Sequence, residues 1–232
     1  MTHFKATRPD GTDFYSGTIN YAAALGSDRL VQHPRPGQIE IKNAATYISV
    51  ATAATDCTSF TWPARLFSVE PESMSWTPDK LGMPNKRATH AIRILAELPA
   101  WQLFGPRGEG CVSILDRFLT ATYDEKFALN AARDSDWWDA WDRLMAVAGG
   151  GRAGRAGLDA AQGALYVRLY GWGGDGAAYG AALAVLYSGF PELALSDKDY
   201  AALTAPWRKV IGKAHPNDKL PAKRAARKAS AK

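Results

Sequence analysis

The sequence predicts an α+β fold whose strands lie in the first half of the chain and whose helices lie in the second. Short segments typical of strands, separated by turns, fill residues 1–110, whereas apolar side chains recur at helical spacing beyond about residue 111. The apolar fraction of 47% and the charged fraction of 22% are those of an ordinary folded protein. We therefore expect a β-rich domain over 1–110 with a mixed or antiparallel sheet, a helical region over 111–212, and a disordered basic tail over 213–232.

The first expected strands form a hairpin. Residues 4–7 lead into Pro9-Asp10-Gly11, a combination that favours a tight turn, and residues 13–21 are expected to return beside them. The loop that follows, around His33, contains two prolines, which exclude regular strand pairing there.

Four further segments indicate strands. Residues 38–42 alternate polar and apolar side chains, as in a half-buried strand. Residues 47–50 are rich in strand-forming side chains, although the alanines beside them leave a helix possible. Residues 65–70 lie between two prolines and give the clearest strand, and residues 90–98 form either a last strand or a short helix.

Apolar stripes indicate helices in the second half, around residues 114–122, 138–148, 158–169, 183–187 and 196–203. In the second of these, Trp138 and Trp141 share a stripe with Met145, so they are expected in the core and Trp137 points elsewhere. Ser135 and Asp136 are placed to cap its start. In the last, Pro206 must either kink the helix or open a new one.

The basic charge of the chain is concentrated in its tail. The whole chain has 28 basic and 23 acidic residues. Seven basic residues and one acidic residue lie in 213–232, so residues 1–212 hold 21 basic and 22 acidic residues. The tail has little apolar bulk to bury, which predicts disorder. Its residues Lys223, Arg224, Arg227 and Lys228 are candidates for weak, salt-sensitive contacts with nucleic acid.

A glycine-rich segment adds two more candidate phosphate contacts, Arg152 and Arg155. The segment 149–154 has the letters of a dinucleotide-binding motif, but that motif needs a strand before it, and the residues before it predict a helix. A hinge is the expected structure, and a solvated linker without ligand is the alternative for both arginines.

The cysteines and histidines predict no metal site. Cys57 and Cys111 have no Cys or His partner at ligand spacing, and none of the four histidines has such a pattern beside it. Two reduced, buried thiols in a bacterial host cytoplasm are expected, because no export signal precedes them. No apolar run approaches the length of a membrane span, so no membrane association is expected.

Several segments resemble an uncharacterised domain family found in proteins of actinobacterial phages and their hosts. The resemblance is carried by residues 47–51, 55–58, 62–70 and 84–86, and more loosely by 131–134 in the helical part. It implies no catalytic residues. It implies no established activity either, and the leading hypothesis is a phage-type soluble accessory protein that binds a host or phage partner.

A more distant resemblance is to the core of ADP-ribosyltransferases. Ser49 on one strand, followed by the strand at 66–69, resembles the NAD-binding core of that fold, in which a Ser-Thr-Ser segment shapes the pocket and a later Glu acts electrostatically. This chain has Ile48-Ser49-Val50-Ala51-Thr52 at the first segment. The resemblance implies NAD as cofactor and His33, Ser49 and Glu70 near the pocket.

Two classes of function therefore stand beside each other: a binding protein without cofactor whose tail adds affinity for nucleic acid, and an NAD-using enzyme. A purely structural interaction protein without a nucleic-acid role is a third. A cleft lined by His33, Ser49 and Glu70 would favour the enzyme.

Overall fold

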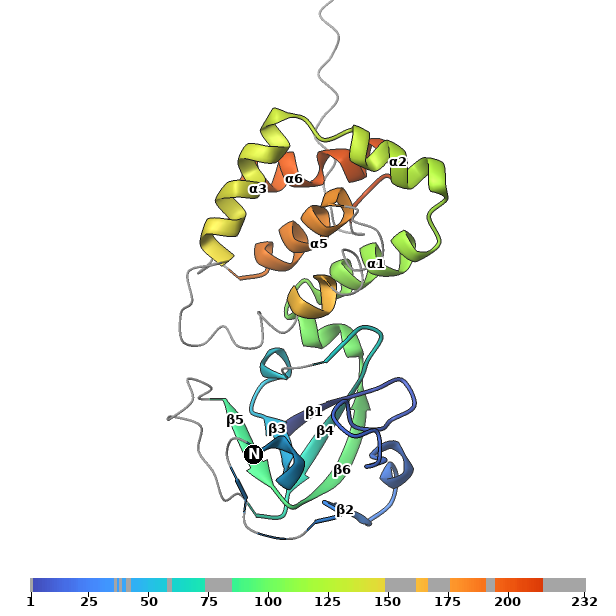
Figure 1. The fold of residues 1–232 in the computed structure, drawn as a ribbon, viewed down its shortest axis with the longest axis vertical. Helices are drawn as coiled ribbons and strands as arrows, with labels where there is room; N and C mark the ends of the chain where they lie inside the picture. The colour runs from blue at the N-terminus through green and yellow to red at the C-terminus, as the bar shows by residue number, and fades with distance from the viewer. Residues whose placement is uncertain are drawn as a thin grey trace, which may run out of the picture.

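The chain folds into a sheet half and a helical half that lie one above the other (Figure 1). The computed structural model describes residues 2–35, 37, 39–40, 43–57, 60–73, 85–148, 162–166, 176–190 and 195–214. Strands come first and most helices follow, so the predicted α+β class is confirmed. The tail lies outside the described residues apart from Lys213 and Ala214.

The sheet half is one six-stranded sheet in which every pair of neighbours is antiparallel. Its strands are β1 (His3–Thr7), β2 (Leu30–Gln32), β3 (Ile48–Ala51), β4 (Arg65–Pro71), β5 (Lys86–Thr89) and β6 (Ala91–Leu98), and they lie in the order β2-β6-β4-β1-β3-β5. The strands predicted at 47–50, 65–70 and 90–98 are confirmed as β3, β4 and β6. The segment 38–42 falls largely outside the described residues, and its described members, Ile39 and Glu40, belong to no strand.

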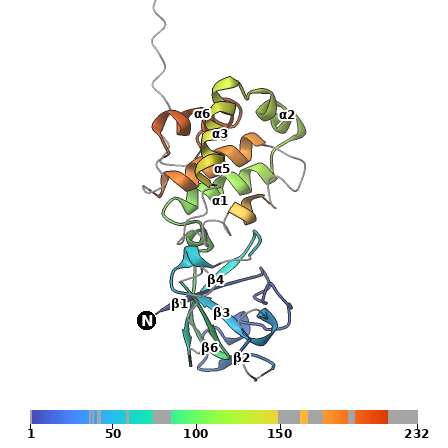
Figure 2. The ribbon, with the colours of Figure 1, turned by 60° about the vertical axis from the view of Figure 1, so that its left-hand side comes forward.

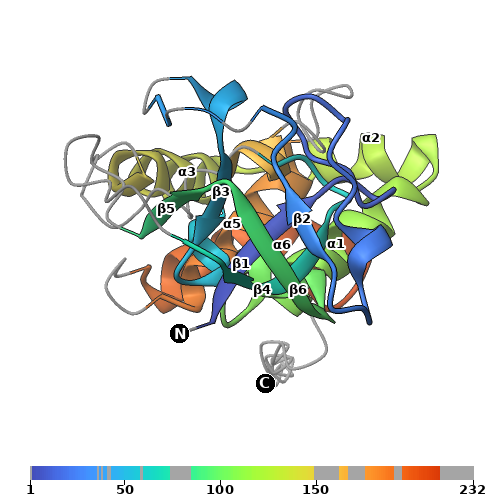
Figure 3. The same ribbon diagram turned by 90° about the horizontal axis from the view of Figure 1, so that it is seen from below.

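The sheet curls strongly. β5 and β6 are separated by His90 alone, yet β5 lies at one edge and β6 pairs with β4 and β2 near the other. These strands can meet only because the sheet wraps around, as the view from below shows (Figure 3). The wrapped face encloses a small apolar core formed by Tyr21, Ala24, Val31, Ile48, Val50, Phe67, Val69, Ile92 and Ile94.

The strand predicted at residues 4–7 is confirmed as β1, but its pairing in a hairpin with residues 13–21 is wrong. The turn forms, since the Gly11 amide donates to the Arg8 carbonyl at 2.9 Å, but β1 pairs with β3 and β4 instead. The Asp13 carboxylate accepts from the amides of Thr18 at 3.0 Å and Ile19 at 2.9 Å. Those hydrogen bonds fold the segment into a compact turn, which removes it from the sheet.

The helical half packs around a buried central helix. Its helices are α1 (Gly108–Leu119), α2 (Tyr123–Ala131), α3 (Ser135–Ala148), α5 (Gly176–Ser188) and α6 (Asp197–Val210). Every residue of α5 from Gly176 to Tyr187 is buried, and the other helices lie around it (Figure 2). A helix that is apolar on all sides must be enclosed in this way. Pro206 lies inside α6, which continues to Val210.

The tryptophans of α3 are placed differently from the prediction. Trp137 is buried and stacks on Trp141 with ring centroids 5.3 Å apart, whereas Trp138 is 48% exposed. The fully buried positions are Trp137, Ala140 and Leu144, and Trp141 and Met145 are partly buried against the same core. The prediction is therefore confirmed for Trp141 and Met145 and wrong for Trp138, whose expected place in the core Trp137 takes. The cap is also one residue earlier, because Asp134 accepts from the Trp137 amide at 3.0 Å.

One large apolar core joins the two halves. It contains Ala51 and Leu66 from the sheet together with residues of the helices such as Leu183 and Leu203. Between the halves, the buried ring of Phe104 packs against two other rings: its centroid lies 5.8 Å from that of Phe60 and 5.3 Å from that of Trp62.

Candidate functional site

The structure does not bring His33, Ser49 and Glu70 together. Phe4 of β1 pairs with Ala51 on one side and with Ser68 on the other. Ser49 lies two residues before Ala51 and Glu70 lies two residues after Ser68, so strand geometry separates them by roughly 16 Å. His33 follows β2 on the far side of β6, roughly 14 Å from Glu70 by the same geometry.

Each of the three residues has a local environment. The buried His33 receives the Arg35 amide on Nδ1 at 3.2 Å, and its own amide donates to the His90 carbonyl at 2.7 Å. Ser49 lies within β3. Glu70 is exposed and lies 3.8 Å from the Arg93 Nε atom, a distant surface pair.

The candidate nucleic-acid contacts Arg152, Arg155, Lys223, Arg224, Arg227 and Lys228 all lie outside the described residues.

A half-buried lysine lies inside the curl of the sheet. Lys5 of β1 is opposite Phe67, and its Nζ atom donates to the Ser49 carbonyl at 3.1 Å and lies 5.1 Å from the centre of the Tyr21 ring. Burial, together with the charge of Lys86, lowers the pKa of Lys5 to about 8. The Lys5 amine therefore donates to a strand carbonyl in an environment that disfavours its charged form.

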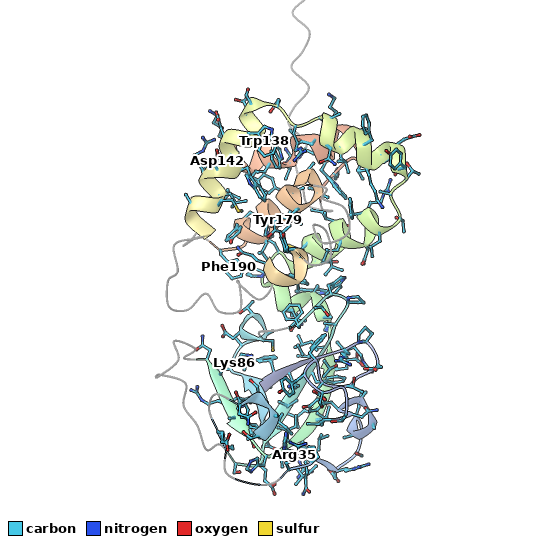
Figure 4. All side chains as sticks on the ribbon, in the orientation of Figure 1. Arg35, Lys86, Trp138, Asp142, Tyr179 and Phe190 are labelled. Atoms are coloured by element: carbon cyan, nitrogen blue, oxygen red, sulfur yellow. The ribbon has the colours of Figure 1, made fainter. Side chains whose placement is uncertain are left out.

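Another lysine, Lys86, is buried where the sheet approaches the helices (Figure 4). Lys86 is opposite Ala51, a member of the large core, and burial lowers its pKa while Cys57 and Asp56 act in the opposite direction. Burial raises the pKa of Asp56 and of the Cys57 thiol. Both cysteines are buried, as predicted, and a protonated buried thiol is a poor nucleophile.

The exposed side of α2 carries large aromatic side chains. Tyr123 is 81% exposed and Phe127 is 67% exposed, and their spacing of four places them on one side of the helix. Leu119 at the end of α1 is also exposed. We call Tyr123 and Phe127 the α2 aromatic face. Of the nine residues of α2, all described, only Leu129 is buried, so this helix presents most of its surface to solvent.

The outer side of α3 combines the exposed Trp138 with carboxylates. The exposed Asp142 lies one turn after Trp138 on the outer side of the helix (Figure 4). Asp139, one turn before Asp142, is exposed on the same side, and Asp136 is exposed in the first turn. We call Trp138, Asp139 and Asp142 the α3 acidic face. The Arg133 guanidinium already lies 4.8 Å from the centre of the Trp138 ring, so the indole accepts a cation on one side.

The helices that carry these faces are strongly acidic as a group. Residues 108–148 hold eight acidic and four basic side chains, a net charge of −4. Two of the basic side chains are paired, Arg117 with Glu125 and Arg143 with Asp199.

No family model, no curated protein and no solved structure matches this chain. Within the described ranges, His, Cys, Asp and Glu side chains form no group of three or more that could hold a metal ion. In the same part of the chain, each helix is too short or too polar to cross a membrane.

The sequence interpretation missed α2 and therefore the aromatic face. A signal was present: Thr122 accepts from the Glu125 amide at 3.2 Å, and the Glu125 carboxylate accepts from the Thr122 amide at 2.9 Å. This reciprocal pair is a capping box, which the letters T-x-x-E at 122–125 indicate. A helix that begins there places Tyr123 and Phe127 on one side.

Proposed function

We propose that this protein acts by binding another protein, a host or phage protein, through the α2 aromatic face, and that its basic tail adds weak affinity for nucleic acid. The observation that carries the proposal is the exposure of Tyr123 and Phe127, 81% and 67%, side by side on one helix. Water-exposed aromatic side chains in a cluster are typical of protein-binding surfaces, where they supply much of the affinity.

The charges near the face define the partner further. Asp116, one turn before Leu119, and Asp124, next to Tyr123, are exposed, and the surrounding helices carry a net charge of −4. A partner with an apolar patch surrounded by Lys and Arg side chains complements this surface. Such charges accelerate association and make it sensitive to salt.

Site-specific photo-crosslinking tests the proposal. A photoreactive phenylalanine analogue replaces Phe127 in the full chain, and the same analogue replaces Tyr15, which is 68% exposed on the sheet half. We expect position 127 to trap one defined protein in the host cell and position 15 not to trap it. Identical adducts at the two positions, or none at 127, would contradict the proposal.

A paired variant tests the same surface by affinity. Tyr123→Ser/Phe127→Ser should weaken binding of the trapped partner at least tenfold, because removing two central aromatic side chains costs about 2 kcal/mol or more. Tyr15→Ser, which removes an equally exposed ring elsewhere, should leave the affinity unchanged.

A further inference from the structure

The C-terminal segment leaves α6 close to one end of the α3 acidic face. Arg143, late in α3, pairs with Asp199, early in α6, while the Trp137 indole, early in α3, donates to the Leu203 carbonyl at 3.3 Å. The two helices therefore run antiparallel, and the end of α6 lies beside the start of α3. The chain is fixed there, because Trp207 Nε1 donates to the Lys213 carbonyl at 3.3 Å and Ala214 is buried.

The length of the remaining chain suffices to cover the face. Residues 215–232 can extend to about 60 Å, whereas α3, with its 14 residues, is about 21 Å long. The segment therefore reaches any point on the outer side of α3 without displacing α6.

The charges of the two partners are complementary. Residues 215–232 hold six basic and one acidic side chain, and residues 108–148 carry a net charge of −4. The exposed carboxylates of Asp139 and Asp142 and the exposed Trp138 indole are suitable partners for the Lys and Arg side chains of this segment.

We propose that the α3 acidic face binds the chain's own basic C-terminal segment, residues 215–232. A polyanion such as nucleic acid then competes with α3 for the same basic side chains. This consequence for nucleic acid rests on the proposed affinity of the tail, whereas the docking itself does not.

Distance measurement between two spin labels tests the docking in the full chain. The labels are attached to cysteines introduced by Ala146→Cys, on the exposed side of α3, and Ser230→Cys, while the native Cys57 and Cys111 are buried and remain unlabelled. We expect a narrow population of short distances at low salt that broadens in 1 M salt, where exposed charges are screened within about 3 Å.

A matched pair of charge variants decides whether the face is the right one. Asp139→Asn/Asp142→Asn should abolish the short-distance population, whereas Asp28→Asn/Glu72→Gln, which removes two exposed charges from the sheet half, should preserve it. The proposal is overturned if the short-distance population survives Asp139→Asn/Asp142→Asn. It is also overturned if the doubly labelled chain with an unmodified α3 shows no short-distance population.

Binding of a labelled 20-nucleotide single strand separates this proposal from the nucleic-acid role. If the tail binds nucleic acid, Asp139→Asn/Asp142→Asn should bind the strand several-fold more tightly than the unmodified chain, since the competing face is weakened. If neither protein binds the strand, the proposed nucleic-acid role fails, and the docking is still decided by the distance measurement.

Discussion

At the scale of single residues, the sheet half depends on a lysine whose surroundings disfavour its charged form. Lys5 lies inside the curl with Tyr21 and Phe67, and its amine serves the Ser49 carbonyl. A buried polar group that has a partner stabilises a fold, but its charged form opposes burial. The stability of this protein should therefore depend on the protonation of Lys5, and of Lys86, whose pKa is also lowered by burial.

We expect stability to rise with pH between about 8 and 10.5 because of Lys5. Its pKa is about 8 in the folded chain and 10.5 as an ordinary lysine, so in this range the unfolded chain binds more protons than the folded one. Relative to Lys5→Met, the unmodified protein should gain up to about 3 kcal/mol in free energy of unfolding across the range, and nothing below it.

Urea unfolding at pH 7, 8, 9 and 10 measures this difference. The exposed Lys198→Met is the control, and its curve should run parallel to that of the unmodified protein at every pH. If the curve of Lys5→Met also runs parallel to that of the unmodified protein, the pKa of Lys5 is not lowered by folding and the prediction is wrong.

At the scale of elements, α5 has glycines where the side chains of Trp137 and Arg133 pack against it. A Cβ atom on Gly180 would lie 2.8 Å from Trp137 Cζ2, and one on Gly176 would lie 2.6 Å from an Arg133 nitrogen. The stacked pair of Trp137 and Trp141 therefore fits against a flat stretch of α5.

Gly180→Ala should destabilise the protein by about 1–3 kcal/mol, because the added methyl group overpacks the contact with Trp137. The intrinsic helix preference of Ala would act in the opposite direction by about 1 kcal/mol. Gly163→Ala is the matched control: it lies in a helical turn with nothing within 4 Å of the new methyl group, and it should be neutral or stabilising. Thermal unfolding of both variants tests this prediction. An equal rise in Tm for Gly180→Ala and Gly163→Ala would contradict the close packing of Gly180 against Trp137.

The elements that sequence predicts well are those with a strong local pattern. β4 and β6 are rich in apolar, strand-forming residues, and a proline stands at the end of each. Both were predicted to within a residue or two. β2 and β5 were missed, since they have three and four residues and are specified by partners elsewhere in the chain.

The candidate site was less predictable than the fold. Trp137 and Trp138 each belong to an acceptable helical stripe, and neighbouring helices decide which of them is buried: Gly180 of α5 leaves room for the Trp137 ring, and the Leu203 carbonyl of α6 accepts from its indole. Exposure of Tyr123 and Phe127 likewise depends on what other helices leave uncovered. Composition did locate the charge imbalance, because the tail is basic whatever the fold.

At the scale of the whole molecule, the shared core makes the two halves depend on each other. Cys57, in the sheet half, and Cys111, in α1, belong to the same large core, and burial raises the pKa of both thiols. The Cys111 sulfur lies 3.5 Å from the Ala182 carbonyl at the centre of the helical half. Neither thiol should react with alkylating reagents until its surroundings open.

The two thiols should therefore become reactive at the same urea concentration. Pulsed labelling with iodoacetamide, followed by mass spectrometry of the two cysteine peptides, gives a separate unfolding midpoint for each half. Coincident midpoints indicate a single cooperative unit. Phe104→Ala removes the ring that contacts Phe60 and Trp62 and should lower both midpoints together, by about 3–5 kcal/mol of stability. If Cys57 instead reacts while Cys111 is still protected, the halves unfold independently, and the boundary near residue 110 separates two domains despite the core that they share.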